Sequence, residues 1–473
     1  MPAVVLSGCC LRVGSHEQHN NSFSLAPSDG PYNVLDERVY FQAGAGGKVN
    51  AGGEKASGII FQPETGNLAT PTHASLKRFL SPEVVADFPT QGADPEGHQN
   101  GSNAVWNYHK YITTTEKETD PETRKPTRGR WDHIYMYGAP ADTAAYCKRG
   151  QLMQLVQYKA LFEGYLEHMM APQVGTQYGY TAVIFWKSQS PWPAMRGALY
   201  DSYLATTGGF WGARAALQPL HVQLNLHTMR LTVVNMRAEQ SPATVVRVSA
   251  YSVPGGKKLT LPFATVTVDA LPAVSRRQLL LHHVTWPSEV LAADAVVLYR
   301  LELVHAVDAT PISSNEYWRS NPASHQDYSS LAAIEYSTGG APGVEVGITA
   351  TPVLIPSTLV GPLEVEYTLE LTNHGTEMAF GVSLEVRNKT AVTQQQQQQQ
   401  DVAVAFGAAG ETRLLPVWFS DNLFALLPAE KREVTLRLSQ DAMQVGMHQV
   451  SLEGWNVRPA QAMLPPPNVA AEE

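Results

Sequence analysis

The spacing of apolar residues changes once along this chain, near Pro219, and that change limits the possible folds. Between residues 146 and 170, apolar side chains recur every three or four positions, which predicts a helix with one apolar face. After Pro219 the apolar residues alternate with polar ones, most regularly over residues 363–371, as expected of half-buried strands. The 473 residues therefore divide into a mixed α/β part and an all-β part.

The predicted helix lies between two short apolar runs, at residues 58–61 and 181–186. Such short runs, bounded by loop residues, are typical of buried parallel strands. Strand, long helix and strand in this order form the repeating unit of a parallel α/β fold. We therefore expect residues 1–215 to contain parallel strands joined by helices.

The all-β part is long enough for more than one domain. Short alternating strands separated by turn residues continue for about 250 residues, which predicts two β-sandwiches of ordinary size. A polar stretch near Ser324 is the expected boundary between them, which gives domains at 1–215, 216–324 and 325–473. A tract of seven glutamines at residues 394–400 is expected to be a loop between two strands of the second sandwich.

Composition excludes several classes of function. The net charge is −9 and no basic stripe is present, so we expect no nucleic-acid partner. No run of 18 apolar residues occurs, so no membrane span is expected. Three cysteines and scattered histidines offer no metal-binding spacing, and no cofactor is predicted. The N-terminus has no basic residue ahead of its short apolar stretch, so we expect no secretory signal peptide. We therefore expect a soluble protein, and the sequence does not indicate its compartment.

Aromatic and polar residues gather where strands are predicted to end. Trp186, Gln189 and Trp192 follow the run at 181–186, while Trp106 and His109 occur earlier in the chain. In a parallel α/β barrel, the C-terminal ends of the strands form the active face. Tryptophan beside amide groups is typical of a sugar site, because the ring stacks on the apolar face of a sugar. The alternative is that these tryptophans fill the end of the barrel as packing residues.

Glu64 follows the other predicted strand, at 58–61. A carboxylate at the C-terminal end of a strand projects into the mouth of a barrel, where catalytic groups are found. Glu64 is therefore a candidate catalytic residue, although acids at such positions can also be structural.

Several segments, taken together, resemble glycoside hydrolase family 2. The likeness is closest to the plant mannosylglycoprotein endo-β-mannosidases and the exo-β-glucosaminidases. It spans residues from about 29 to 456, so it covers most of the chain. The segments that carry it are 185–193, 196–201, 208–212, 219–223, 314–318, 415–422 and 454–456.

The resemblance implies a retaining hydrolase with a (β/α)8 TIM barrel and immunoglobulin-like sandwiches, the last of them of the exo-β-glucosaminidase type. Two glutamates about 5–5.5 Å apart do the chemistry in retaining enzymes, and no cofactor is needed. Glu64 matches the nucleophile at the end of the seventh barrel strand. Trp186 matches the residue at the end of the eighth strand, which lines the subsite of the cleaved sugar. The implied partner is a glycan that contains β-mannosides.

The sequence departs from the family pattern at the second glutamate. The acid/base residue belongs to an Asn-Glu pair well before the nucleophile, and no such pair precedes Glu64. Glu17 follows His16 instead of Asn, which leaves its catalytic role open. A full barrel needs about 250 residues, so we expect only its C-terminal part here.

The leading hypothesis is a β-mannosidase-type hydrolase with little turnover as this chain. One alternative is an exo-β-glucosaminidase. The other is a non-catalytic carbohydrate- or protein-binding relic, in which only the sandwiches act.

Overall fold

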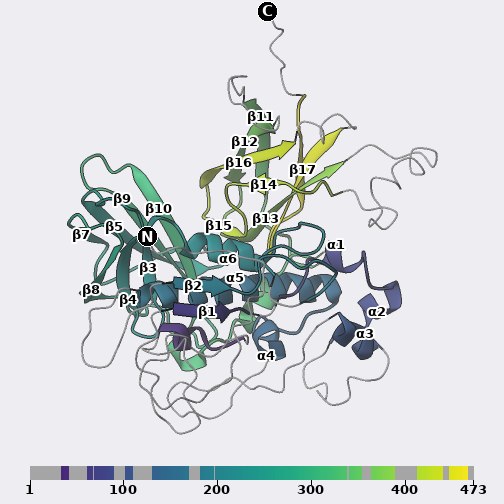
Figure 1. Cartoon of the computed structure of the whole chain (residues 1–473), viewed down its shortest axis with the longest axis horizontal. Coiled ribbons are helices and arrows are strands. Elements are labelled where there is room, and N and C mark those ends of the chain that lie inside the picture. The colour runs from purple at the N-terminus through teal and green to yellow at the C-terminus, as the bar shows by residue number, and fades with distance from the viewer. Residues whose placement is uncertain are drawn as a thin grey trace, which may run out of the picture.

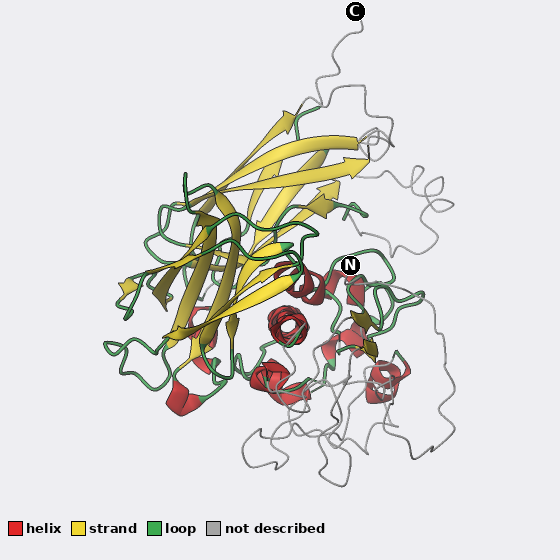
Figure 2. Ribbon diagram, turned by 60° about the vertical axis from the view of Figure 1, so that its left-hand side comes forward, coloured by secondary structure: helices red, strands yellow, loops and turns green. Residues whose placement is uncertain are grey.

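Strands dominate the computed structural model of the chain, and one long helix runs through its middle (Figure 1). Figure 2 shows most of the strands on one side of the molecule and most of the helices on the other. The structure describes residues 34–41, 61–67, 69–89, 102–109, 130–169, 182–195, 198–337, 340–353, 364–388, 413–439 and 447–466.

The helix predicted at 146–170 is confirmed as α5 (Thr143–Glu167), whose first turn is capped by Asp142. The Asp142 carboxylate accepts a hydrogen bond from the backbone N–H of Ala145 at 2.8 Å. The prediction of a single apolar face is wrong, because α5 is buried on almost every side. Helix α6 (Gly208–Ala216) packs along it, and Gly212 permits this approach since a Cβ there would overlap the carbonyl oxygen of Leu155.

The remaining short helices of the N-terminal part are η1 (Glu37–Phe41), α1 (His73–Leu76), α2 (Pro82–Ala86), α3 (Ser102–Tyr108) and α4 (Arg130–Tyr135). Among them, η1, α1 and α4 contact α5, whereas α2 and α3 contact each other. Two further 3-10 helices, η3 (Pro322–Ser324) and η4 (Ser329–Ile334), follow the first sandwich.

Two parallel strands flank α5 in the sequence, as the strand–helix–strand pattern predicts. β1 (Phe61–Thr65) pairs with β2 (Ala182–Phe185), with Phe61 opposite Ala182 and Thr65 opposite Phe185. Within the described residues these two strands form a sheet of their own. The partial TIM barrel therefore stays a prediction.

The first sandwich consists of two antiparallel sheets. One has the order β3-β4-β8, and the other has the order β10-β9-β5-β6 with β7 also paired to β5. The strands are β3 (Leu220–Asn225), β4 (Arg230–Asn235), β5 (Thr244–Val253), β6 (Lys258–Leu259), β7 (Thr265–Val268), β8 (Ser275–His283), β9 (Val296–His305) and β10 (Pro311–Ser320).

The second sandwich has two sheets of four strands, ordered β11-β12-β16-β14 and β15-β13-β17-β18. The regular alternation at 363–371 is confirmed as a strand, β12, which pairs with both β11 and β16. The strands are β11 (Val346–Val353), β12 (Glu364–Asn373), β13 (Ala379–Asn388), β14 (Trp418–Phe419), β15 (Phe424–Leu426), β16 (Lys431–Ser439), β17 (His448–Glu453) and β18 (Ala460–Met463).

Helix α5 contributes to two hydrophobic cores. Tyr146 and Leu152, in its first half, share a core with the second sandwich. Tyr158 and Phe162, in its second half, share a core with the first sandwich. The domain limits predicted near residues 215 and 324 stay predictions, and α5 ties the three parts together across both of them.

Candidate functional site

The C-terminal ends of β1 and β2 lie side by side. The backbone N–H of Trp186 donates a hydrogen bond to the carbonyl oxygen of Thr65 at 2.6 Å, one residue beyond the Thr65–Phe185 pair. Because the strands are parallel, both chains leave the sheet at the same edge. Glu64 immediately precedes Thr65, so its backbone lies one residue before the Thr65–Trp186 hydrogen bond at this edge. The side chain of Glu64 lies outside the described part of the structure, as does all of Glu17.

Buried polar side chains of α5 hold the segment that follows β1. The amides of Gln151 and Gln154 both donate to the carbonyl oxygen of Thr70, at 2.7 and 2.8 Å. The Tyr158 hydroxyl donates to the carbonyl oxygen of Asn67 at 3.3 Å. A chain segment bonded at several points keeps one conformation. These contacts therefore fix the path of the chain directly after the candidate nucleophile.

The segment after β2 is also anchored. Phe185, the last strand residue, packs against Tyr158 and Phe162 with ring centroids 5.3 and 5.6 Å apart. Trp186 is half-buried, whereas Gln189 is exposed. The structure thus places Trp186 at the strand end and leaves the amide of Gln189 open to solvent.

Trp192 and His109, two of the predicted site residues, lie together in the structure. Their rings are 5.8 Å apart, and Nδ1 of His109 lies 2.6 Å from the carbonyl oxygen of Pro193. Since a carbonyl only accepts, His109 carries a proton on Nδ1. Tyr108 meets Trp192 edge-to-face at 5.9 Å and is 71% exposed. The sequence analysis missed Tyr108, although its place between Trp106 and His109 is a signal that could have found it.

Trp106 differs from the other candidates, because its side chain is only 1% exposed. Its indole N–H donates to the carbonyl oxygen of Val84 at 3.1 Å, and its ring meets Tyr146 edge-to-face at 6.2 Å. A ring enclosed in this way offers no face to a sugar. The packing alternative therefore describes Trp106 in this structure.

The described residues hold no group of three or more His, Cys, Asp or Glu side chains placed to bind a metal ion. None of the helices within the described ranges combines the length and the apolar character needed to cross a bilayer. Cys147 is buried, and its burial raises the pKa of the thiol above the ordinary range.

Known proteins are similar in sequence to this chain over most of its length. Residues 402–457 match the family described as the exo-β-D-glucosaminidase Ig-fold domain. A mannosylglycoprotein endo-β-mannosidase from Lilium longiflorum is 27% identical over 454 residues, which cover 91% of this chain and 44% of the relative. An exo-β-D-glucosaminidase from Streptomyces avermitilis is 25% identical and aligns with 90% of this chain and 42% of its own length. The predicted resemblance is confirmed.

The chain thus spans less than half the length of these glycosidase relatives. The solved structure of the exo-chitosanase CsxA from Amycolatopsis orientalis superposes with a TM-score of 0.65 at 20% identity, over 92% of this chain and 45% of that one. A β-D-mannosidase from Dictyoglomus thermophilum superposes with a TM-score of 0.51 at 15% identity, over 91% and 40% of the two chains. The fold described above is therefore shared with the corresponding part of these glycosidases.

Proposed function

We propose that this chain carries the nucleophile of a retaining β-glycosidase, with Glu64 in that role. The observation that supports it most directly is the paired edge of β1 and β2, where Glu64 directly precedes Thr65, the residue whose carbonyl oxygen accepts a hydrogen bond from Trp186. In a retaining mechanism, the carboxylate attacks the anomeric carbon, the leaving group departs and a glycosyl-enzyme forms. Water then hydrolyses that ester and returns the free carboxylate.

The sugar is held by aromatic faces in this proposal. Trp186 lines the subsite of the cleaved sugar, and Gln189 offers amide donors and an acceptor to its hydroxyls. The pair of Trp192 and His109, with Tyr108 against it, forms a second aromatic surface. Trp106 has no part in binding because its ring is enclosed.

The substrate we favour is a glycan that contains a β-mannoside, since the Lilium longiflorum relative bears the name of an endo-β-mannosidase. The alternative substrate is a β-glucosaminide. It is supported by the match at residues 402–457 and by the name of the Streptomyces avermitilis relative. Both substrates require the same attack by Glu64, so the nucleophile is tested before the specificity.

A mechanism-based reagent tests the nucleophile without any acid catalyst. A dinitrophenyl fluoro-β-mannoside has a leaving group that departs without a proton, and its fluorine slows hydrolysis of the glycosyl-enzyme. We expect mass spectrometry to find one fluoroglycosyl group on the peptide that contains Glu64. The corresponding β-glucosaminide with fluorine at C5, which keeps the amino group at C2, tests the alternative substrate in the same way.

Glu64→Gln is the control, because it keeps the size of the side chain and removes the nucleophile. This variant should acquire no adduct from either reagent. An adduct on another residue would contradict the assignment of Glu64. No adduct in the unmodified chain would favour the alternative of a non-catalytic binding protein.

A further inference from the structure

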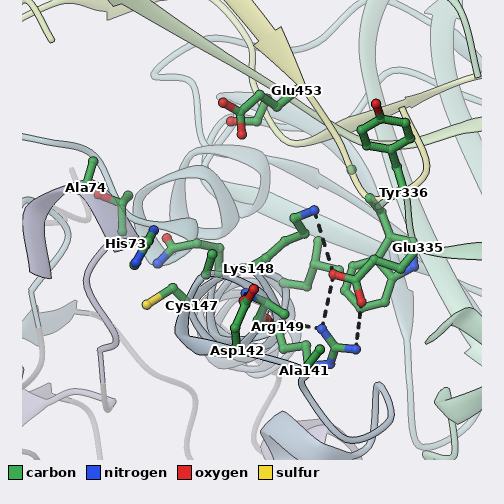
Figure 3. Close-up of a pocket in the computed structure, with 18 of the residues that line it drawn as sticks. His73, Ala74, Ala141, Asp142, Cys147, Lys148, Arg149, Glu335, Tyr336 and Glu453 are labelled. Carbon is green, nitrogen blue, oxygen red and sulfur yellow. Dashed lines mark hydrogen bonds and ion pairs between the residues drawn. The ribbon is translucent and has the colours of Figure 1, made fainter. Parts of the chain in front are cut away.

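An open groove of about 1150 Å³ lies where the start of α5 meets the second sandwich. Figure 3 looks along α5, with His73 on one side of the helix and Glu335 and Tyr336 on the other. Glu453, from β17, lies across the groove from the helix. Three parts of the chain that are far apart in sequence therefore form the walls of one groove.

The groove lies on the same side of the molecule as the candidate nucleophile. Helix α5 returns the chain from the end of β1 toward the start of β2, so its N-terminus lies on the side of the C-terminal strand ends. Tyr158 of α5 contacts Phe185 at the end of β2, and Lys148 lines the groove. Ten helical residues separate Tyr158 from Lys148, a distance of about 15 Å along the axis.

The walls are fixed to one another, which gives the groove a definite shape. The guanidinium of Arg413 donates to the hydroxyls of Thr72 and Ser75, both at 3.0 Å, and so ties the second sandwich to α1. At the opposite end, Arg149 binds the Glu335 carboxylate through two hydrogen bonds, at 2.8 and 3.2 Å. These contacts hold the helices and the sandwich apart by a set distance.

Several polar groups of the groove remain open to a ligand. Within the described residues, the side chains of His73 and Lys77 form no hydrogen bond or ion pair on the helical wall. On the sandwich wall, one oxygen of Glu453 accepts a long hydrogen bond from Arg387 at 3.4 Å, and its side chain is 54% exposed. The ring of Tyr336 is half-buried between these walls. Donors, an acceptor and an aromatic ring thus line a single groove.

We propose that this groove binds the remote part of an oligosaccharide substrate, the sugar rings beyond the bond that is cleaved. Sugar hydroxyls both donate and accept, so they can bond to Lys77 and Glu453 at once. Charged partners strengthen such hydrogen bonds, and the ring of Tyr336 can cover an apolar sugar face. The inference rests on the proposed function, because it extends the same substrate along the molecule.

Calorimetry with two oligosaccharides tests this binding in the Glu64→Gln chain, which cannot cleave them. The probes are a β-linked glucosamine hexasaccharide and a β-linked mannose hexasaccharide. We expect Glu453→Gln and Lys77→Ala each to weaken binding about tenfold, the loss typical of one charged hydrogen bond. Glu433→Gln and Lys258→Ala are matched controls, because both residues are exposed and do not line the groove. Their affinities should equal that of the Glu64→Gln chain.

The two probes also distinguish which kind of sugar chain the groove binds. Glu453→Gln should weaken binding of the glucosamine hexasaccharide more than binding of the mannose hexasaccharide, because the amino groups carry positive charge. For the same reason, binding of the glucosamine hexasaccharide should weaken as the salt concentration rises. Equal affinities in the groove variants and the controls, or no binding of either probe, would overturn the groove as a binding site. Trapping of Glu64 is measured separately, so oligosaccharide binding without an adduct would refute the nucleophile and retain the groove.

Discussion

At the scale of single residues, Glu163 is the most unusual group in the described part of α5. Its carboxylate is fully buried and accepts hydrogen bonds from Asn315 and Tyr317 of β10, both at 2.7 Å. Burial raises its pKa from 4.5 to about 7, although the nearby Lys159 opposes the change. Burial also lowers the pKa of Lys159, to about 8. The contact between α5 and the first sandwich is therefore sensitive to pH.

The sign of this dependence follows from the raised pKa. Between pH 4.5 and about 7 the unfolded chain releases the proton of Glu163 while the folded chain keeps it. The contribution of Glu163 to the free energy of unfolding should therefore fall as pH rises through this window, by up to about 1.4 kcal/mol per pH unit. Glu163→Gln should remove this slope, because glutamine does not titrate. Urea unfolding at several pH values measures the free energy of unfolding of both proteins. If it changed equally with pH in the two proteins, Glu163 would not be the group responsible.

A second prediction at this scale concerns the missing proton donor. No Asn-Glu pair precedes Glu64, so this chain should act on a substrate whose leaving group needs no proton. General acid catalysis contributes roughly 10²–10⁴-fold. We expect a dinitrophenyl β-mannoside to react at least about 10²-fold faster than an alkyl β-mannoside, which is the lower end of this range. Comparable rates for the two substrates would reveal an acid that the sequence analysis did not find.

At the scale of elements, close packing of α6 on α5 depends on glycine. A Cβ at position 212 would overlap the carbonyl oxygen of Leu155, so the two helices would have to separate. Gly212→Ala should lower the free energy of unfolding by about 1–3 kcal/mol, as overpacking does. Gly255→Ala is the control, since its new Cβ would meet only the Ser252 hydroxyl at 3.3 Å. Thermal unfolding compares the two, and equal losses would show that the helices adjust freely.

The elements also show what periodicity can predict. The local spacing of apolar residues was sufficient to predict α5 as a helix and β12 as a strand, because each pattern repeats over several turns or pleats. The same spacing did not predict that α5 is buried on almost every side, because Gln151, Gln154 and Glu163 look like solvent-facing residues in the sequence. Their partners lie on distant segments, and only tertiary structure reveals that these side chains are buried and bonded.

The candidate site was predictable to a similar extent. Strand ends and residue types brought Glu64 and Trp186 forward as candidates, yet their placement at one edge of the sheet depends on the register between β1 and β2. The same reasoning selected Trp106, whose indole instead binds Val84 inside the helical core. Residue type alone does not separate a ring that faces solvent from one that fills a core.

At the scale of the whole molecule, Arg300 of β9 joins the two sandwiches. Its guanidinium donates to Glu316 of β10 at 2.9 Å and to Glu430, directly before β16, at 3.0 Å. Burial alone would raise the pKa of Glu316, but Arg300 and Arg432 hold it below its ordinary value. The Glu316 carboxylate also accepts a hydrogen bond from the backbone N–H of Ala425 at 3.2 Å. The sandwiches therefore share a buried ionic network.

Removal of that arginine should destabilise both sandwiches together. Arg300→Met leaves the carboxylates of Glu316 and Glu430 without their shared cation, a change that costs about 3–5 kcal/mol for a buried pair. Hydrogen exchange should accelerate in β12 and in β9 alike. Arg437→Met is the control, because Arg437 pairs with Glu366 where its side chain is 47% exposed, and such a pair contributes little. Faster exchange in β9 alone would contradict the shared network.

A crystal structure of the chain after reaction with the dinitrophenyl fluoro-β-mannoside tests the central claim most directly. The account predicts a bond between the anomeric carbon and a carboxylate oxygen of Glu64, with the sugar ring against Trp186. A sugar bonded to another side chain, or one bonded to Glu64 but turned away from Trp186, would contradict it.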